Sequence, residues 1–170
     1  MSEAPVEIVA YDASWPAQFE AERARLAGAL APWLAGPIEH IGSTAVSGLP
    51  AKPVIDIMAA VGTLDASRPA IEAAAALGYC YFPYRPEFEH WFCRPSAAFR
   101  THHLHLVPFG SRQWIETLRF RDALRVDPEA AAEYAALKID LAARYRFDRE
   151  AYTAAKAPFV ARLVAQSPPP

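Results

Sequence analysis

The sequence has little of what secreted, membrane-spanning or disulfide-stabilised proteins contain. Its two cysteines, Cys80 and Cys93, are too few for a disulfide framework and form no Cys-x-x-Cys pair, so we expect reduced thiols rather than structural zinc. No segment approaches the roughly 18 apolar residues of a membrane span. The N-terminus lacks the basic stretch and apolar core of a signal peptide. We therefore predict a cytoplasmic protein without a membrane partner.

Charge of one sign is also scarce. The 170 residues carry a formal net charge of −2, so bulk electrostatics do not indicate DNA, RNA or an anionic membrane as a partner. The hydrophobic content of 53% and the aromatic content of 12% are sufficient for a folded core. Because neither an internal repeat nor a linker interrupts the chain, we predict one domain over residues 1–170 with a frayed tail at 166–170. The oligomeric state stays open.

Short apolar runs with strand-like spacing alternate with longer segments of helical spacing. The predicted strands are residues 6–11, 38–41, 54–61, 79–84, 91–94 and 102–108, of which the last three suggest a meander. The predicted helices are residues 17–33, 67–77, 111–125, 128–145 and 149–166. This order predicts an α+β fold, with a mixed β-sheet core flanked by helices and a C-terminal run of about three helices.

A turn of small residues between two strand-like runs is the most unusual local feature. In the tripeptide Gly42-Ser43-Thr44, backbone N–H groups can approach a ligand and the serine hydroxyl could donate to a phosphate oxygen. An ordinary tight turn is the alternative, since no Walker-type Gly-x-x-x-x-Gly-Lys is present. The run that follows contains Asp56, and a carboxylate in an apolar strand requires a partner, a hydrogen bond or a metal. Between them Lys52 could hold an anion or be a solvated loop cation.

Three of the five histidines lie in one short predicted strand. Strand alternation places His103 and His105 on one face, and His102, Leu104 and Leu106 on the other, which we predict to be the core side. Two imidazoles on one face could ligate a metal, shuttle protons or hydrogen-bond phosphate. A polar sheet face is the plain alternative.

Several charged residues are weaker candidates. Arg121 and Arg125 lie one helical turn apart, so they could grip phosphate together or form surface ion pairs. Two tyrosine–lysine pairs, each four residues apart on a helix, present the same ambiguity: Tyr134 with Lys138, and Tyr152 with Lys156. A last group could supply further ligands, although a charged hairpin turn explains it equally well: Glu87, Glu89 and His90.

In combination, these segments resemble the GrpB family, which is also found fused behind dephospho-CoA kinase and is placed in the nucleotidyltransferase superfamily. The resemblance runs from about residue 6 to residue 162 and rests on Glu39-His40-Ile41-Gly42-Ser43-Thr44-Ala45-Val46, Gly48-Leu49 with Ala51-Lys52-Pro53-Val54-Ile55-Asp56-Ile57, His102-His103-Leu104-His105-Leu106-Val107, Phe120-Arg121-Asp122 with Leu124-Arg125, Tyr134 with Leu137-Lys138, and Tyr152-Thr153 with Lys156.

The resemblance implies a nucleotidyltransferase-like fold. In that superfamily a Gly-Ser turn holds nucleotide phosphates, while Asp-x-Asp or Asp-x-Glu and a third carboxylate on a neighbouring strand bind magnesium for nucleotidyl transfer. Gly42, Ser43 and Asp56 match the first part, but Met58 stands where the second acid is expected and residues 102–107 contain no acid. One carboxylate with neutral imidazoles suits a two-magnesium site poorly.

We therefore expect a protein that binds a nucleotide, such as a nucleoside triphosphate, or another phosphorylated small molecule. Three forms of the site remain open: a divalent metal (Mg, Mn or Zn) on Asp56, His103 and His105, a metal-free phosphate site, or a fold that binds without transfer. In the first, these three residues would be catalytic in nucleotidyl transfer; imidazole favours zinc, manganese or nickel over magnesium. The alternative is an inactive nucleotide-binding sensor or adaptor linked to CoA metabolism. The residues expected to bind the phosphorylated ligand are Gly42, Ser43, Thr44, Lys52, Arg121 and Lys138.

Overall fold

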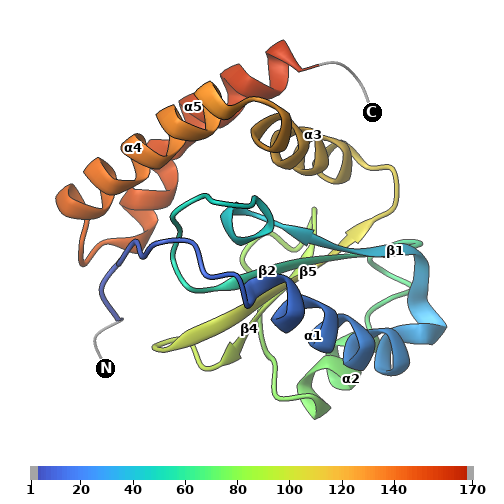
Figure 1. The fold of residues 1–170 in the computed structure, drawn as a ribbon. Coiled ribbons are helices and arrows are strands. Elements are labelled where there is room, and N and C mark those ends of the chain that lie inside the picture. Colours follow the sequence, from blue (N-terminus) through green and yellow to red (C-terminus); the bar gives the residue numbers. More distant parts are fainter. Residues whose placement is uncertain (1–3, 168–170) are drawn as a thin grey trace.

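The structure, a computed structural model, describes residues 4–167. These residues form one five-stranded mixed sheet and five α-helices, which lie on both of its faces (Figure 1). The strands are β1 (Leu34–Ile41), β2 (Ile55–Val61), β3 (Cys80–Phe82), β4 (His90–Pro95) and β5 (Arg100–Pro108). The helices are α1 (Trp15–Leu30), α2 (Ala70–Ala76), α3 (Arg112–Val126), α4 (Pro128–Arg144) and α5 (Arg149–Gln166). The predicted α+β class and the three C-terminal helices are confirmed.

The strand order in the sheet is β1-β2-β5-β4-β3. Only β2 and β5 run parallel, whereas the other neighbours are antiparallel, and β3, β4 and β5 form the predicted meander. The parallel register places Asp56 beside His103 and Met58 beside His105. Because paired residues in adjacent strands point to the same face, these four side chains share one side of the sheet.

Hydrophobic residues cover both faces of the sheet. On one face Ile57, Leu104 and Leu106 are fully buried in the main core, which also contains residues of α1 and α2. On the other face Met58 packs in a cluster with Trp114 of α3. The predicted alternation in β5 is therefore confirmed, with the leucines on the core side.

The three C-terminal helices begin at the predicted caps. The Ser111 side chain accepts a hydrogen bond from the first turn of α3, and Asp127 and Asp148 do the same for α4 and α5. The helices pack on one another around Tyr134 and Phe159, and this cluster includes Val46 and Leu49 from the β1–β2 connection. The C-terminal helices thus cover the connection that contains the Gly42 turn.

Several predicted boundaries differ from the structure: for example, β1 begins at Leu34 rather than at residue 38, and α1 ends at Leu30 rather than at residue 33. Residues 6–11 form no strand and make a single bridge at Val9, because Val6 is buried against Tyr152 and its neighbours on the C-terminal helices instead. The second helix begins at Ala70, since Ser67 bonds back to Thr63 in a preceding turn. The predicted tail at 166–170 overlaps α5 at its first residue, and residues 168–170 lie outside the described part. Within residues 4–167, no helix is both long and apolar enough to cross a membrane.

Candidate functional site

A cavity of about 470 Å³ lies on the sheet face that carries Asp56, His103 and His105. Its walls come from the Gly42 turn, strands β2 to β5, the β3–β4 connection and helices α3 to α5. All predicted site residues except Arg121 line it: Gly42, Ser43, Thr44, Lys52, Asp56, His103, His105 and Lys138. Residues that are up to about a hundred positions apart in the sequence therefore meet in one place.

Gly42 brings the turn into contact with the Asp56 carboxylate. It has a φ of +71°, a conformation that costs little only for glycine. A Cβ at this position would lie 2.5 Å from Oδ2 of Asp56, so no other residue fits without displacing the carboxylate. The Thr44 hydroxyl donates to the carbonyl of Val54 at 3.3 Å, which ties the turn to the start of β2. This geometry explains why the sequence places small residues here.

Asp56 and His103 form a hydrogen-bonded pair, with 2.8 Å between Oδ1 and Nδ1. Burial raises the pKa of Asp56, but the hydrogen bond and charge of His103 outweigh it and hold the pKa at about 2. Burial lowers the pKa of His103, although Asp56 opposes this shift. At neutral pH the imidazole is therefore neutral and donates its Nδ1–H to a charged carboxylate, so its Nε2 is an acceptor. Nε2 is buried and has no hydrogen-bond partner among the described residues.

The second histidine is in the opposite state. His105 Nδ1 lies 2.5 Å from Oε2 of Glu89, a buried carboxylate immediately before β4. Burial lowers the pKa of His105, but the hydrogen bond and negative charge of Glu89 outweigh it and raise the pKa above its usual value. His105 and Glu89 are therefore an ion pair, and Glu89 holds an imidazole rather than completing a charged hairpin turn.

The arrangement does not fit a metal. Asp56 and Glu89 each face one imidazole as a hydrogen-bond partner, and Met58, where a second acid was expected, is a core residue only 1% exposed. Over residues 4–167, no group of three His, Cys, Asp or Glu side chains is placed to hold a metal ion.

The lysines give the cavity its most distinctive property. The chain has only three, Lys52, Lys138 and Lys156, and all three line this cavity, whereas the other 14 of its 17 basic residues are arginines. Lys138 is 2% exposed and its Nζ donates to the carbonyl of Pro50. The Nζ atoms of Lys52 and Lys156 lie 5.2 and 4.4 Å from the ring centroid of Tyr152. We call this space the lysine cavity.

Burial and mutual repulsion disfavour the charged lysines. Burial lowers the pKa of Lys138 to about 7, and the charges of Lys156 and Lys52 act in the same direction. Burial and Lys52 lower the pKa of Lys156 to about 8. Clustered like charges destabilise a folded chain, so an arrangement of this kind is typical of a binding site for anions.

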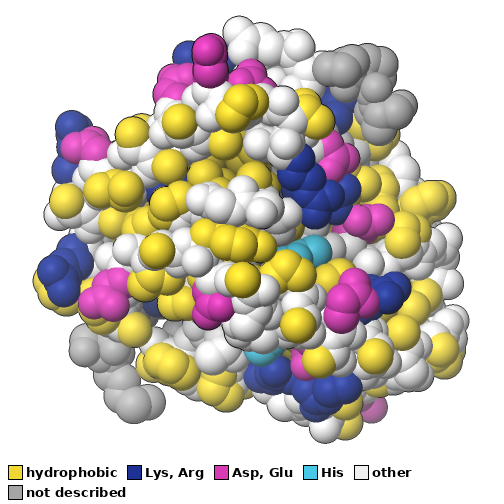
Figure 2. Space-filling view, viewed as in Figure 1, with side chains coloured by type: hydrophobic (Ala, Val, Ile, Leu, Met, Phe, Trp, Pro, Cys, Tyr) yellow, Lys and Arg dark blue, Asp and Glu magenta, His cyan; other side chains and the backbone are white. Residues whose placement is uncertain are grey.

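Other side chains reinforce the positive character of the lysine cavity. It has six basic residues, namely the three lysines with Arg85, Arg100 and Arg149, against three acidic ones, namely Asp56, Glu89 and Glu150. Part of its wall is aromatic, where the ring centroids of Phe82 and Trp91 lie 5.9 Å apart and those of Trp91 and His103 lie 5.2 Å apart. By contrast, Figure 2 shows Lys and Arg side chains on one outer face in small separate groups, with hydrophobic side chains between them.

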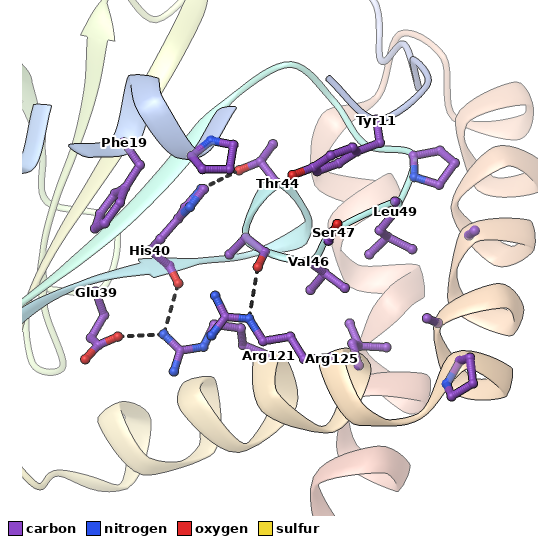
Figure 3. A pocket seen from close by; sticks show the side chains of 18 of the residues that line it. Tyr11, Phe19, Glu39, His40, Thr44, Val46, Ser47, Leu49, Arg121 and Arg125 are labelled. Carbon is purple, nitrogen blue, oxygen red and sulfur yellow. Dashed lines mark hydrogen bonds and ion pairs between the residues drawn. The ribbon is translucent and has the colours of Figure 1, made fainter. Parts of the chain in front are cut away.

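Arg121 lies on the other side of the turn, in a second cavity of about 980 Å³ (Figure 3). Its Nη1 binds Glu39 Oε2 at 2.6 Å and the His40 carbonyl at 3.1 Å, and its neighbour Arg125 donates from Nε to the Ala45 carbonyl at 3.0 Å. The two arginines share a face, as the spacing indicates, but this face holds the backbone on either side of Gly42. Arg121 thus positions the turn from behind and does not reach the lysine cavity.

His40 supports the turn from the same side. Its ring stacks on Phe19 of α1 at a centroid distance of 4.6 Å, and Nε2 lies 2.9 Å from Thr44 Oγ1. Burial lowers the pKa of His40 to about 4, so the ring is neutral and can donate to the threonine hydroxyl at neutral pH. Side chains of α1, β1 and α3 that line the second cavity therefore support the turn.

Sequence reasoning underrated two features of the site. The sequence pattern does not decide whether Glu89 is a further ligand or part of a charged hairpin turn, and it does not decide whether Lys156 and the two tyrosines bind a ligand or lie on a helix surface. A count of the lysines would have helped, because a residue type that is rare in the chain and confined to motif segments is a candidate for function. No comparable signal marks Glu89, since its partner is distant in the sequence.

The chain is similar to known proteins over almost its whole length. The family model described as GrpB protein matches residues 5–166. A UPF0157 protein of Pseudomonas aeruginosa is 39% identical over 95% of this chain and 67% of its own length, and the glutamate-rich protein GrpB of Alkalihalophilus pseudofirmus is 32% identical over 94% of each chain. A dephospho-CoA kinase of Mycolicibacterium paratuberculosis is 32% identical over 94% of this chain, which spans only 45% of that kinase.

Comparison with solved structures also finds a GrpB protein. The crystal structure of the conserved protein GrpB from Enterococcus faecalis matches with a TM-score of 0.84 and 29% identity, over 94% of this chain and 96% of the other. The match in sequence and in structure extends over almost the whole chain, and it includes the segments that build the lysine cavity and its support. The protein belongs to the GrpB family.

Proposed function

We propose that the protein binds a nucleotide or another phosphorylated small molecule in the lysine cavity. The observation that carries the proposal is the concentration of every lysine of the chain in this one cavity. Phosphate is the anion that such a cluster suits, because several ammonium groups can share its oxygens. The volume of about 470 Å³ lies within the range of small-molecule sites.

Each wall of the cavity has a part in this proposal. Phosphate oxygens lie against Ser43 and the three lysines, and Gly42 keeps the turn close enough for this contact. The aromatic wall around Trp91 offers a flat surface on which a nucleobase can stack. The phenols of Tyr134 and Tyr152 are additional donors, because burial raises the pKa of both above the usual value and keeps them protonated.

A transfer reaction is a second candidate, favoured by the state of His103. Its Nε2 is unprotonated and Asp56 fixes the orientation of the ring, so this atom could take a proton from an acceptor hydroxyl. The hydroxyl oxygen would attack the α-phosphorus of a nucleoside triphosphate, the bond from that phosphorus to the bridging oxygen would break, and pyrophosphate would leave. The chain would then be a nucleotidyltransferase-like transferase that uses a carboxylate–imidazole pair as its base.

A sensor without turnover is the alternative. The relative from Mycolicibacterium paratuberculosis is named dephospho-CoA kinase and is more than twice as long as the matched region. A binding module joined to such a kinase could report on a nucleotide or on a CoA precursor, and it would need the lysines but not the base.

The test is a thermal-shift and calorimetric screen of nucleoside triphosphates, CoA, dephospho-CoA and sugar phosphates. We expect at least one of them to stabilise the wild type and Lys156→Gln to lessen this effect. Arg112→Gln, which replaces an exposed arginine outside the cavity, should retain it. If none of them binds, the proposal fails. Mass spectrometry of the bound mixture then separates transfer, which releases a new product, from sensing, which leaves the ligand intact.

A further inference from the structure

Polyphosphate ligands usually bind to proteins together with a divalent cation, which the protein holds through carboxylates. The lysine cavity offers few of these. Its acidic side chains are Asp56, Glu89 and Glu150, and the first two are each hydrogen-bonded to a histidine. Releasing Glu89 would leave a buried ion-pair partner uncompensated, which is strongly unfavourable. Asp56 and Glu89 thus position imidazoles, which leaves Glu150 as the remaining carboxylate of the cavity.

Met58 occupies the position at which a second carboxylate could have joined Asp56 in binding a metal. It lies on the same sheet face as Asp56, two residues along β2, and it packs against Ile41, Val107 and Trp114. An acidic side chain cannot reach Asp56 from this position because the position belongs to the core between the sheet and α3. The sheet face beyond Asp56 along β2 is therefore apolar, at the position where a metal site would need a second carboxylate.

The positive charge is supplied by the lysines instead. The Nζ atoms of Lys52 and Lys156 both lie near the Tyr152 ring, and that of Lys138 lies 4.9 Å from the centroid of Tyr134. Lys138 donates to Pro50, and an ammonium has three hydrogens, so it can also donate to a ligand. Burial, and after it the charges of neighbouring lysines, lower the pKa of Lys138 and of Lys156, and a bound anion would offset both effects.

We propose that the lysine cavity binds the diphosphate or triphosphate group of its ligand without a divalent cation, and that the ammonium groups of Lys52, Lys138 and Lys156 take the place of the metal. This inference rests on the proposed function and specifies the form in which the ligand binds. Magnesium would neutralise part of the phosphate charge in solution and so compete with the lysines. Magnesium-bound ATP is then a poorer ligand than free ATP.

The experiment is isothermal titration of the wild type with inorganic tripolyphosphate and with ATP, first in EDTA and then in excess magnesium chloride. We expect binding in EDTA that weakens about tenfold or more when magnesium is added. Lys156→Gln should weaken binding in EDTA by about tenfold or more, because it removes a charge-assisted contact. Arg112→Gln, which changes charge outside the cavity, should bind as the wild type does.

The outcomes separate this inference from the proposed function. Binding of ATP that requires magnesium overturns the metal-free site but leaves a phosphate-binding function in place. Binding of neither compound under either condition overturns the metal-free site. If no other phosphorylated compound binds in the wider screen, the proposed function also fails. If ATP binds in EDTA more tightly than tripolyphosphate, the ligand is a nucleotide; equal affinity assigns recognition to the phosphates alone.

Discussion

Lys138→Met should make the ligand-free protein more stable. Lys138 is 2% exposed, and burial with the two other lysines lowers its pKa from 10.5 to about 7. A charge is therefore held where the folded protein disfavours it, which is expected of a residue kept for binding rather than for stability. Methionine has a similar length and no charge, so it can fill the same space without the electrostatic cost.

The size of the effect follows from the pKa. A difference of about 3.5 units corresponds to about 5 kcal/mol of unfavourable free energy well below pH 7, and to about 4 kcal/mol at pH 7. The variant leaves the Pro50 carbonyl without this donor, which costs about 1 kcal/mol. Allowing for relaxation around a buried charge, we expect a net gain of about 2 to 3 kcal/mol in the free energy of unfolding at pH 7.

The gain should depend on pH in a definite direction. Because the folded-state pKa of Lys138 lies below its unfolded value, the unfolded chain binds more protons between pH 7 and about pH 10, so stability rises with pH. From pH 7 to pH 9, Lys138 should add about 2 kcal/mol to the wild type and nothing to the variant. The advantage of the variant should therefore shrink by about that amount.

Urea-induced unfolding of both proteins at pH 7 and pH 9, without phosphate in the buffer, measures these differences. Arg112→Met, which removes an exposed charge, serves as the control and should change stability by less than about 0.5 kcal/mol. The reasoning is refuted if Lys138→Met is less stable than the wild type at pH 7, or if the difference between them is the same at both pH values.

Two further substitutions test the turn and its support. Gly42→Ala should destabilise the protein by about 1 to 3 kcal/mol and abolish ligand binding, because the new Cβ would displace the Asp56 carboxylate. The control is Gly48→Ala, because Gly48 has a similar φ of +78° but a Cβ there would meet no atom within 4 Å. This control should lose stability through its backbone conformation alone and should retain ligand binding. Equal loss of ligand binding in both variants would contradict a role for the close contact between Gly42 and the Asp56 carboxylate. Arg121→Met should cost about 2 to 4 kcal/mol in urea unfolding by leaving Glu39 and the His40 carbonyl without their partner; unchanged stability with lost binding would instead indicate direct contact with the ligand.

The local features of the site could be predicted from the sequence because they depend on short-range geometry. The turn at Gly42 and the sidedness of His103 and His105 follow from strand alternation and from small residues between two apolar runs. The caps of the last three helices are likewise local. In each case the residue and its structural consequence lie within a few positions of one another.

The remaining features depend on how distant segments pair. Glu89 meets His105 because the β4–β5 register places Trp91 opposite that histidine, and this register cannot be read from either strand alone. Arg121 and Lys138 both lie on helices that cover the Gly42 turn, yet one reaches its back and the other the cavity. Helical periodicity predicts on which side of its helix a residue lies, but it does not predict which other element packs against that side.

The central claim is that a phosphate-bearing ligand occupies the cavity formed around the three lysines. Because the chain has no lysine elsewhere, acetylation with a lysine-selective reagent, read by mass spectrometry at each position, reports on this cavity directly. The account predicts that ATP or tripolyphosphate in EDTA protects Lys52, Lys138 and Lys156 together, at concentrations that match the calorimetric affinity. A ligand that binds while all three lysines react at their original rates would contradict the account.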